Sequence, residues 1–273
     1  MLTQVDVRTD SGTLLQLPLE DYSEGVLVKD ITGLDPVAAT IVSSSFAQLD
    51  GEQYQTARRE KRNIVFTLGL ESDYSSFTVR QIRSSLYKFF MPKSNVNMTF
   101  NMDDGPALQI SGRVESFAAP LFTKDPEATL SLLCFDPNFV DPNVVTVEGN
   151  TTDSTNNDQI EYDGTVETGF QFHMVADRDI AQFSIYAQDE SGSQTSLDFD
   201  AALSSGDTID ISTVAGAKSA RLTRDGAQSS ILYGVSPFSA WVNLFPGVNQ
   251  FRVQAAGDPV PYTLSYTNKY GGL

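Results

Sequence analysis

The fold class is decided by the segment Asn63-Ile-Val-Phe-Thr-Leu-Gly-Leu70, in which apolar residues recur at every second position. Successive side chains of an extended strand point to opposite faces, so Ile64, Phe66 and Leu68 would share one face. The segment Val96-Asn-Met-Thr-Phe-Asn-Met102 repeats this alternation. Both segments therefore predict β-strands with one buried face.

Shorter stretches with the same alternation recur along the chain, separated by turn-forming pairs such as Asp-Gly and Pro-Gly. Ser and Thr together far outnumber the 18 Lys and Arg residues, and polar β-branched surfaces favour strands over exposed helices. The sequence therefore predicts a mainly β protein built as a sandwich or a barrel. The further expected strands are residues 26–31, 108–117, 129–134, 182–187, 209–211, 230–233, 250–253 and 262–266.

Residues 75–91 follow a helical period instead of a strand period. We expect Ser75 or Ser76 to cap the start of this helix and Pro92 to stop it. One face of about four turns would then be apolar and would pack on a sheet. The apolar positions, at spacings of three and four, are Val79, Ile82, Leu86, Phe89 and Phe90.

The composition excludes several classes of protein. The 273 residues carry a formal net charge of −17, which repels nucleic-acid phosphates and anionic membrane surfaces. The single cysteine, Cys134, excludes an intramolecular disulfide and a Cys-rich zinc site. No apolar run reaches the length of a membrane span, and the first residues lack the features of a signal peptide. We expect no cofactor, no metal and no membrane partner.

The single histidine, His173, limits the catalytic chemistry that the chain could perform. It alternates with Phe172 and Met174, so a strand would place His173 on the wetter face. We therefore expect a solvated histidine and no catalytic residue. Close acidic pairs, such as Asp177 with Asp179, would suit a glycosidase or a Ca²⁺ site, but 35 acidic residues produce such pairs by chance.

A domain boundary is expected at Phe135-Asp-Pro-Asn-Phe-Val-Asp-Pro142, because two prolines there end the preceding strand. The first domain would cover residues 1–142 and the second residues 143–273. Within a strand of the first domain, Gly112 next to Arg113 predicts a bulge or a close approach of two backbones.

A cluster of cations, Arg58-Arg-Glu-Lys-Arg62, interrupts this strongly acidic sequence. Four cations on one loop would attract an acidic partner, and a second copy of the same chain is such a partner. Arg58, Arg59, Lys61 and Arg62 are therefore our candidate contacts between subunits. One alternative is a solvated loop without a partner. A contact with DNA is a third possibility, which the overall negative charge disfavours.

The order of several motifs along the chain resembles the distal tail proteins of bacteriophages with long, non-contractile tails. In the first half these motifs are Asp30-Ile-Thr-Gly-Leu34, Leu49-Asp-Gly51, the strand 63–70, Phe89-Phe-Met-Pro92, Ile110-Ser-Gly-Arg-Val-Glu-Ser116 and Leu133-Cys-Phe-Asp-Pro-Asn-Phe139. In the second half they are residues 170–174, Ala240-Trp-Val-Asn-Leu-Phe-Pro-Gly-Val-Asn-Gln-Phe-Arg-Val253 and Asn268-Lys-Tyr-Gly-Gly-Leu273.

This resemblance implies an N-terminal split β-barrel with one α-helix, followed by a galectin-like β-sandwich. It also implies a structural protein of the virion, not an enzyme, that forms a hexameric ring at the tail tip after synthesis in the bacterial cytoplasm. The implied partners are further copies of the chain, the tail tube protein, the end of the tape-measure protein, the tail-associated hub protein and receptor-binding proteins. DNA would only pass through the lumen.

Two other functions compete with this structural role. A carbohydrate-binding module would stack a sugar on an aromatic ring, and Trp241 is the single tryptophan available. The His-x-Asn-x-Arg run of galectin sugar sites is absent, however, so Trp241 is better explained as a core or interface residue. A polysaccharide-cleaving enzyme is the third possibility, and it would depend on the acidic pairs.

Overall fold

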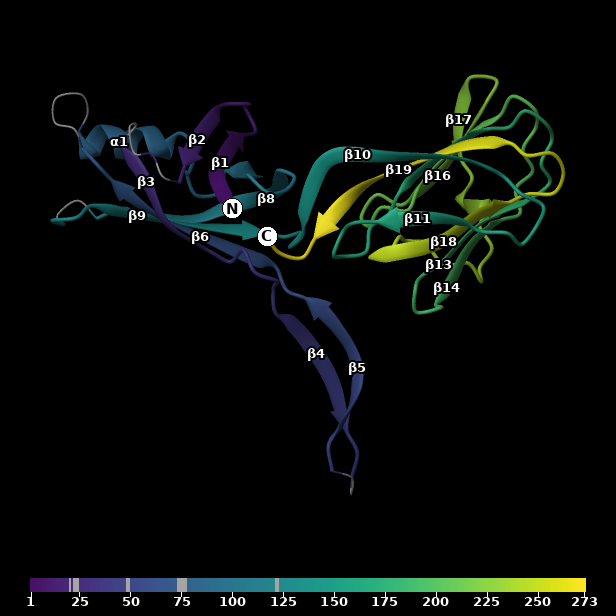
Figure 1. The fold of residues 1–273 in the computed structure, drawn as a ribbon, viewed down its shortest axis with the longest axis horizontal. Coiled ribbons are helices and arrows are strands. Elements are labelled where there is room, and N and C mark those ends of the chain that lie inside the picture. Colours follow the sequence, from purple (N-terminus) through teal and green to yellow (C-terminus); the bar gives the residue numbers. More distant parts are fainter. Residues whose placement is uncertain (20, 22–24, 48–49, 73–77, 121–122) are drawn as a thin grey trace. The chain divides into compact units, whose positions relative to one another are not determined.

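The computed structural model describes the whole chain except residues 20, 22–24, 48–49, 73–77 and 121–122 (Figure 1). The described residues form two compact units: residues 1–142 together with 271–273, and residues 143–270. The expected second domain, 143–273, therefore ends with three residues that belong to the first unit. Strand β10 and the end of β19 are the two places where the chain crosses between the units.

Seven strands of the first unit form one antiparallel sheet in the order β2-β1-β7-β8-β9-β6-β3. Its two end strands, β2 and β3, contact each other without a ladder among the described residues, so the barrel stays open along that seam. This arrangement agrees with the split barrel that the resemblance implied. The strands are β1 (Leu2–Thr9), β2 (Leu14–Pro18), β3 (Val26–Thr32), β6 (Arg62–Leu70), β7 (Asn95–Met102), β8 (Leu108–Ala118) and β9 (Glu127–Cys134).

The core of the first unit follows the predicted alternation. In β6, Ile64, Phe66 and Leu68 are buried, while the residues between them are half-buried. Gly112 of β8 lies against the next strand, because an added Cβ would come within 3.0 Å of the Cys134 sulfur. The close neighbour is thus a side chain, while the nearest backbone atom, the Leu133 carbonyl oxygen, would lie at an ordinary 3.6 Å. The predicted close approach of two backbones is therefore wrong, and the register shift between β8 and β9 lies further on, between Val114 and Ser116.

Helix α1 (Val79–Tyr87) is shorter than the four turns expected. It begins after Thr78, whose side chain accepts a hydrogen bond from the Gln81 N–H, while the Gln81 side chain accepts one from the Thr78 N–H. The expected caps, Ser75 and Ser76, lie outside the described residues. Ile82 and Leu86 are buried as predicted, and Phe89 and Phe90 are buried just beyond the end of the helix.

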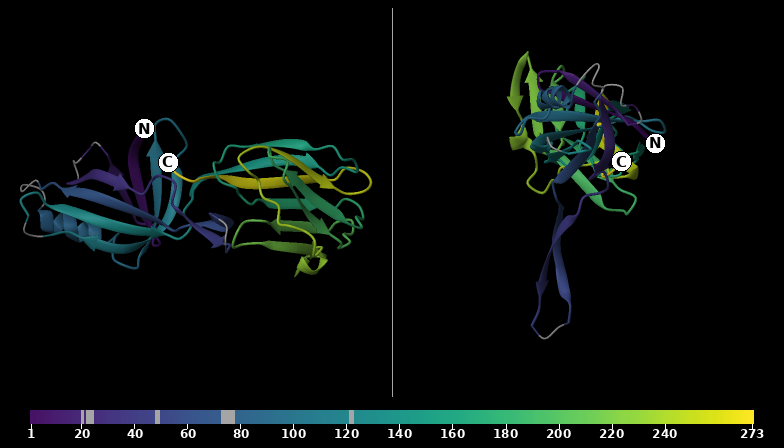
Figure 2. Two further views of the ribbon diagram at one scale, coloured as in Figure 1. Left: turned by 90° about the horizontal axis from the view of Figure 1, so that it is seen from below. Right: turned by 90° about the vertical axis from the view of Figure 1, so that its left-hand side faces the viewer.

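Strands β4 (Ala39–Ser45) and β5 (Glu52–Arg59) pair only with each other among the described strands. Figures 1 and 2 show this hairpin extending away from the other strands of the first unit. Almost every one of its described side chains is exposed to solvent. We call it the β4–β5 hairpin.

The second unit is a β-sandwich, as the resemblance implied. One sheet has the order β17-β16-β15-β12-β19-β10 and the other β11-β18-β13-β14, with aromatic contacts such as Phe170 against Phe251 in the core between them. The strands are β10 (Phe139–Asn150), β11 (Asp158–Tyr162), β12 (Gln171–Val175), β13 (Phe183–Gln188), β14 (Gln194–Phe199), β15 (Thr208–Ser212), β16 (Ser219–Arg224), β17 (Ala227–Ser230), β18 (Gly247–Gln254) and β19 (Pro261–Tyr270).

The strand predicted at 230–233 is wrong. The chain there forms a short 3-10 helix, η1 (Leu232–Gly234), because it leaves one sheet and reaches the edge of the other. The Ile231 N–H donates to the Ala220 carbonyl of β16, and the Ser236 N–H donates to the Asp198 carbonyl of β14. A segment that connects two sheets in so few residues has no room for a ladder with one neighbour.

Candidate functional site

The β4–β5 hairpin carries four large apolar side chains that are open to solvent. Their exposed fractions are 65% for Ile41, 48% for Val42, 52% for Phe46 and 63% for Tyr54. An isolated two-stranded hairpin is marginally stable in water, and exposed apolar groups on it favour contact with another surface. We call these four residues the hairpin surface. It is the candidate functional site with the most physical support.

Sequence reasoning missed the hairpin surface. The alternation in β4 is weak, since Ile41 and Val42 are adjacent and a run of serines follows them. The sequence does carry one signal, the turn-forming pair Asp50-Gly51. In the structure Ala39 pairs with Arg59 and Ser45 with Glu52, which makes a long two-stranded ribbon. Periodicity cannot show, however, that neither face of this ribbon is covered.

The candidate subunit contacts do not share one loop, so that expectation is wrong. Arg58 and Arg59 are the last residues of β5, Lys61 lies in the connection, and Arg62 is the first residue of β6. Arg58 and Lys61 are exposed, and Arg59 donates a hydrogen bond to Asn138 Oδ1 at 2.7 Å. Arg62 is only 1% exposed and is therefore unable to reach a neighbouring subunit.

Arg62 joins three separate backbone segments of the first unit through four carbonyl groups. Its Nε donates to the Pro137 carbonyl at 2.7 Å, and its Nη1 donates to the carbonyls of Gly33 at 2.6 Å and Asp35 at 2.7 Å. Its Nη2 donates to the Gly271 carbonyl, and the guanidinium lies 4.5 Å from the centre of the Phe139 ring. Burial lowers the pKa of Arg62, but it remains a cation.

Gly33 explains why the motif Asp30-Ile-Thr-Gly-Leu34 requires a glycine. Its φ is +86°, and an added Cβ would lie 2.0 Å from the Asn63 carbonyl oxygen. Any larger residue would push the Gly33 carbonyl away from Arg62. The motif therefore supports the Arg62 cluster, which consists of Arg62 and the carbonyls of Gly33, Asp35, Pro137 and Gly271.

Trp241 is half-buried against the core of the second unit. The Lys218 ammonium lies 5.5 Å from the centre of its ring, which fits a cation–π contact. The ring is thus packed on one side and approached by a cation. Its role as a ligand or partner aromatic stays a prediction.

His173 lies on the wetter face of β12, as predicted. It pairs with Asp210 in the neighbouring strand β15, with 2.7 Å between His173 Nδ1 and Asp210 Oδ1. Both side chains are about half exposed. Such a pair is typical of cross-strand polar contacts on a solvated sheet.

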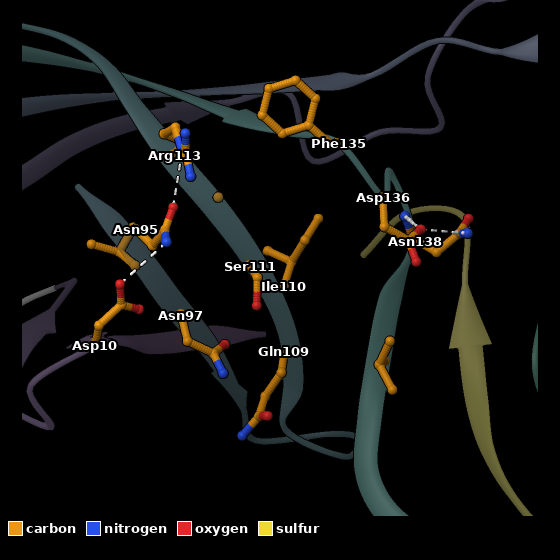
Figure 3. A pocket seen from close by; sticks show the side chains of 13 residues that line it. Asp10, Asn95, Asn97, Gln109, Ile110, Ser111, Arg113, Phe135, Asp136 and Asn138 are labelled. Carbon is orange, nitrogen blue, oxygen red and sulfur yellow. Dashed lines mark hydrogen bonds between the residues drawn. The ribbon is translucent and has the colours of Figure 1, made fainter. Parts of the chain in front are cut away.

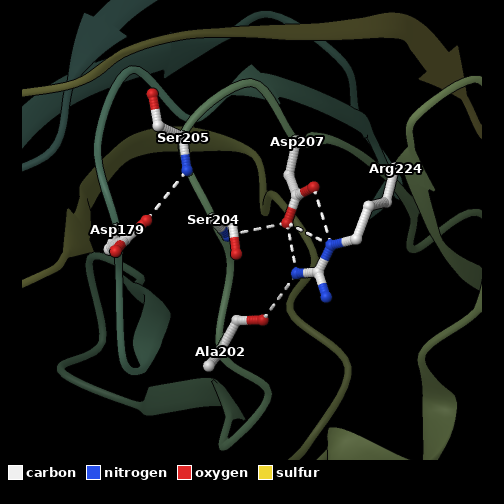
Figure 4. A network of polar contacts seen from close by, with 6 residues as sticks. All are labelled: Asp179, Ala202, Ser204, Ser205, Asp207 and Arg224. Atoms are coloured by element: carbon white, nitrogen blue, oxygen red, sulfur yellow. Dashed lines mark hydrogen bonds and ion pairs between the residues drawn. The ribbon is translucent and has the colours of Figure 1, made fainter.

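Acidic residues of the second unit organise a loop (Figure 4). The buried Asp207 accepts hydrogen bonds from the Ser204 N–H at 2.7 Å and from Arg224 Nε at 2.9 Å, and Asp179 accepts one from the Ser205 N–H. The Arg224 side chain is the main cause that holds the pKa of Asp207 below its usual value. A carboxyl group kept ionised in this way is a poor general acid.

Other chemistries find little support in the described part of the chain. No group of three His, Cys, Asp or Glu side chains is close enough there to hold a metal ion. Burial raises the pKa of the Cys134 thiol to about 11, which leaves it protonated and unreactive. No helix described in the structure has the length and apolar character needed to cross a membrane.

Comparison with known proteins finds a family that matches the second unit and a solved structure that shares the fold of the chain. Residues 163–270 match the family described as the siphovirus-type tail component, C-terminal domain. The solved structure of the Dit protein of phage SPP1 has a TM-score of 0.70 at 18% identity. That protein is described as a paradigm of the hub adsorption apparatus in phages that infect Gram-positive bacteria. That match covers 97% of this chain and 98% of the other. A comparison with curated protein sequences finds no match.

Two structures of a phage P2 baseplate in its activated conformation, one with Ca and one with Sr, also match. The first has a TM-score of 0.48 at 10% identity and covers all of both chains. The second has a TM-score of 0.44 at 9% identity and covers 96% of this chain and 97% of the other. The resemblance inferred from the motifs is confirmed by the family match of the second unit and by the fold of the whole chain.

Proposed function

We propose that this chain, a structural component of a siphovirus-type tail, forms a six-membered ring that joins the tail tube to the host-adhesion device. The family match over residues 163–270 and the fold shared with the SPP1 Dit protein support the tail role. The proposed neighbours are other copies of the chain, the tail tube, the end of the tape-measure protein, the tail-associated hub protein and receptor-binding proteins. The proposed location is the tail tip of the virion.

The main structural observation in support of a ring is the exposed β4–β5 hairpin. A surface that includes Ile41 and Tyr54 at more than 60% exposure would be costly to leave in water in the mature particle. A closed ring needs head-to-tail contacts, in which one patch of a subunit meets a different patch of the next. The hairpin supplies one patch of such a pair, and the first unit of the neighbouring copy supplies the other.

Charge complementarity favours a second copy as the occupant. Arg58 and Lys61 are exposed at the base of the hairpin, on a chain with a net charge of −17. These cations would face the acidic surface of the neighbour, while like surfaces repel. The self-repulsion of six acidic chains requires screening, which at a salt concentration of about 0.1 M acts over roughly 10 Å. Ring formation is therefore expected to need moderate salt.

The test reverses the exposed cations and measures the size of the assembly. The Arg58→Glu, Arg59→Glu, Lys61→Glu triple variant should remain a folded monomer under conditions where the native chain forms sixfold particles. Light scattering after size exclusion gives the mass, and negative-stain images give the symmetry. Arg62 is left unchanged, because its burial would confuse loss of assembly with loss of folding.

A matched control distinguishes the effect of where the reversed charges lie from the effect of the changed net charge. Arg80, Lys88 and Lys124 are exposed cations of the first unit outside the hairpin, and their reversal to Glu changes the charge equally. This control should assemble like the native chain. Native assembly by the hairpin variant would refute the contact, and a native chain that stays monomeric at every salt and protein concentration would refute self-assembly.

A further inference from the structure

The first unit contains a cavity of about 620 Å³ that the proposed ring does not explain. Strands β7 and β8 form its floor, and residues 135–140, which lead from β9 into β10, form the opposite wall (Figure 3). This volume lies within the range of roughly 300–1,000 Å³ that is usual for small-molecule sites. The side chains that line it determine which ligand it would recognise.

The floor presents neutral polar side chains that are free to bind. Asn97 of β7 lies opposite Ser111 of β8 in the ladder, and Gln109 of β8 is two residues away on the same face. None of these three side chains makes a hydrogen bond with another described residue, and all three line the cavity. Amide and hydroxyl groups both donate and accept hydrogen bonds, which matches the hydroxyl groups of a polyol.

The rim is already ordered by hydrogen bonds. Asn95 donates to Asp10 Oδ2 at 3.2 Å and accepts from Arg113 Nε at 2.9 Å. On the other wall, Asn138 donates to Asp136 Oδ1 at 2.9 Å. Charged groups on the rim are thus held by neutral amides, and the site does not concentrate charge of one sign. This order reduces the entropy that a bound ligand would have to remove.

An exposed aromatic ring lines the cavity. Phe135 is 69% exposed, and Figure 3 shows its ring at the end of the cavity lining where Arg113 lies. A phenylalanine with this exposure gains little from the core, so its ring offers a face for stacking. The apolar C–H face of a pyranose ring fits such a surface while its hydroxyl groups face the amides.

We propose that this cavity is a saccharide-binding site, with Phe135 as the stacking platform and Asn97, Gln109 and Ser111 as the groups that bind hydroxyls. The ligand is a neutral mono- or disaccharide unit of a longer glycan. An anionic ligand would face two carboxylates, Asp10 and Asp136, against the single guanidinium of Arg113. The site depends on the first unit alone and does not require the ring.

An extended peptide is the main alternative. β8 pairs with β10 only at Gln109 and with β9 only from Arg113 onward, so its backbone from Ile110 to Gly112 has no described partner on that side. A free edge of three residues offers a shorter ladder than that of a typical strand, which spans about five to six residues. A saccharide therefore fits better.

The test measures binding of simple saccharides to the full-length protein. Saturation-transfer NMR with glucose, galactose, rhamnose, N-acetylglucosamine and their disaccharides should give contacts for at least one sugar, with a dissociation constant of about 1 mM, as expected for a small open site. Phe135→Ala and the double variant Asn97→Ala, Gln109→Ala should each weaken binding by about tenfold or more. Their thermal transitions should stay native, because these side chains are not in the core.

Phe238→Ala is the matched control, since Phe238 is 96% exposed on the second unit and should not affect binding. Three outcomes would overturn the proposal. The first is no saturation transfer from any sugar at about 10 mM. The second is binding that survives Phe135→Ala. The third is binding of an unstructured tetrapeptide, but of no sugar, with chemical-shift changes at residues 110–112.

Discussion

At the scale of single residues, Arg62 has the largest structural role of the cations that the sequence singled out. Its side chain binds four carbonyl groups from three backbone segments, including Pro137 at the start of one crossing and Gly271 at the end of the other. Arginine suits this position because its planar group directs donors in several fixed directions, whereas lysine carries a single ammonium.

We predict that Arg62→Lys lowers the free energy of unfolding by about 3 kcal/mol, because several buried carbonyls lose their donors. Denaturant unfolding followed by fluorescence measures this change. Arg80→Lys, on the exposed face of α1, should change stability by less than about 0.5 kcal/mol. Equal effects of the two variants would show that the Arg62 cluster is not important for stability.

The Asp207–Arg224 pair predicts a pH dependence of stability. The folded protein holds the pKa of Asp207 below its usual value, chiefly through Arg224, so the pair stabilises the fold above the unfolded pKa of about 4. This contribution is lost as the pH falls through the lower, folded pKa. The stability difference between the native chain and Asp207→Asn should thus be constant from about pH 8 to 5 and shrink below about pH 4.

The same difference measured for Asp153→Asn, a substitution at an exposed carboxylate, is the control. It should be small and should not shrink in the same way. A native-minus-Asp207→Asn difference that is flat down to about pH 2 would contradict the assigned role of the pair.

At the scale of elements, the β4–β5 hairpin and helix α1 make opposite use of apolar residues. Helix α1 buries Ile82 and Leu86 within its own unit, so its stability comes from that core. The hairpin leaves Ile41 and Tyr54 in solvent and is attached at its base by a hydrogen bond from the Glu60 N–H to the Ala38 carbonyl. Its contribution to the isolated fold is therefore small.

We predict that replacing residues 39–59 by an Asn-Gly turn leaves the melting temperature within about 3 °C of the native value while abolishing assembly. The 38–60 hydrogen bond shows that the chain ends at the base are close enough for this short turn. Calorimetry and light scattering test the two parts separately. A shortened chain that still forms sixfold particles would remove the hairpin from the ring contact.

At the scale of the whole molecule, two units are connected by two crossings of the chain. Each unit has its own buried core, and the last three residues return to the first unit, where the Leu273 N–H donates to the Leu34 carbonyl at 3.1 Å. A domain with its own core is expected to fold independently. The sandwich therefore should not need residues 271–273.

We predict that a fragment of residues 143–270 folds with a single cooperative thermal transition. Calorimetry should give equal calorimetric and van't Hoff enthalpies, which is the mark of two-state unfolding. A fragment that is soluble but melts without a cooperative transition would show that the two units depend on each other for folding.

The sequence by itself determined the features that depend on neighbouring residues. Alternation identified the buried face of β6, and spacings of three and four identified the apolar stripe of α1, because burial of one face imposes the period of the element. The alternation around His173 likewise placed it on the solvated face. The motifs in their order indicated the type of protein, which the family match of the second unit supports.

Only the tertiary structure decided the environment of Arg62, of the hairpin and of the cavity near Phe135. Arg62 and Lys61 are adjacent cations, yet one is buried and the other exposed, because the carbonyls that bind Arg62 come from positions 33 to 271. Asn97 and Phe135 line one cavity for the same reason. Periodicity describes which way a side chain points from its own strand, but the groups that meet it there depend on how distant strands pair.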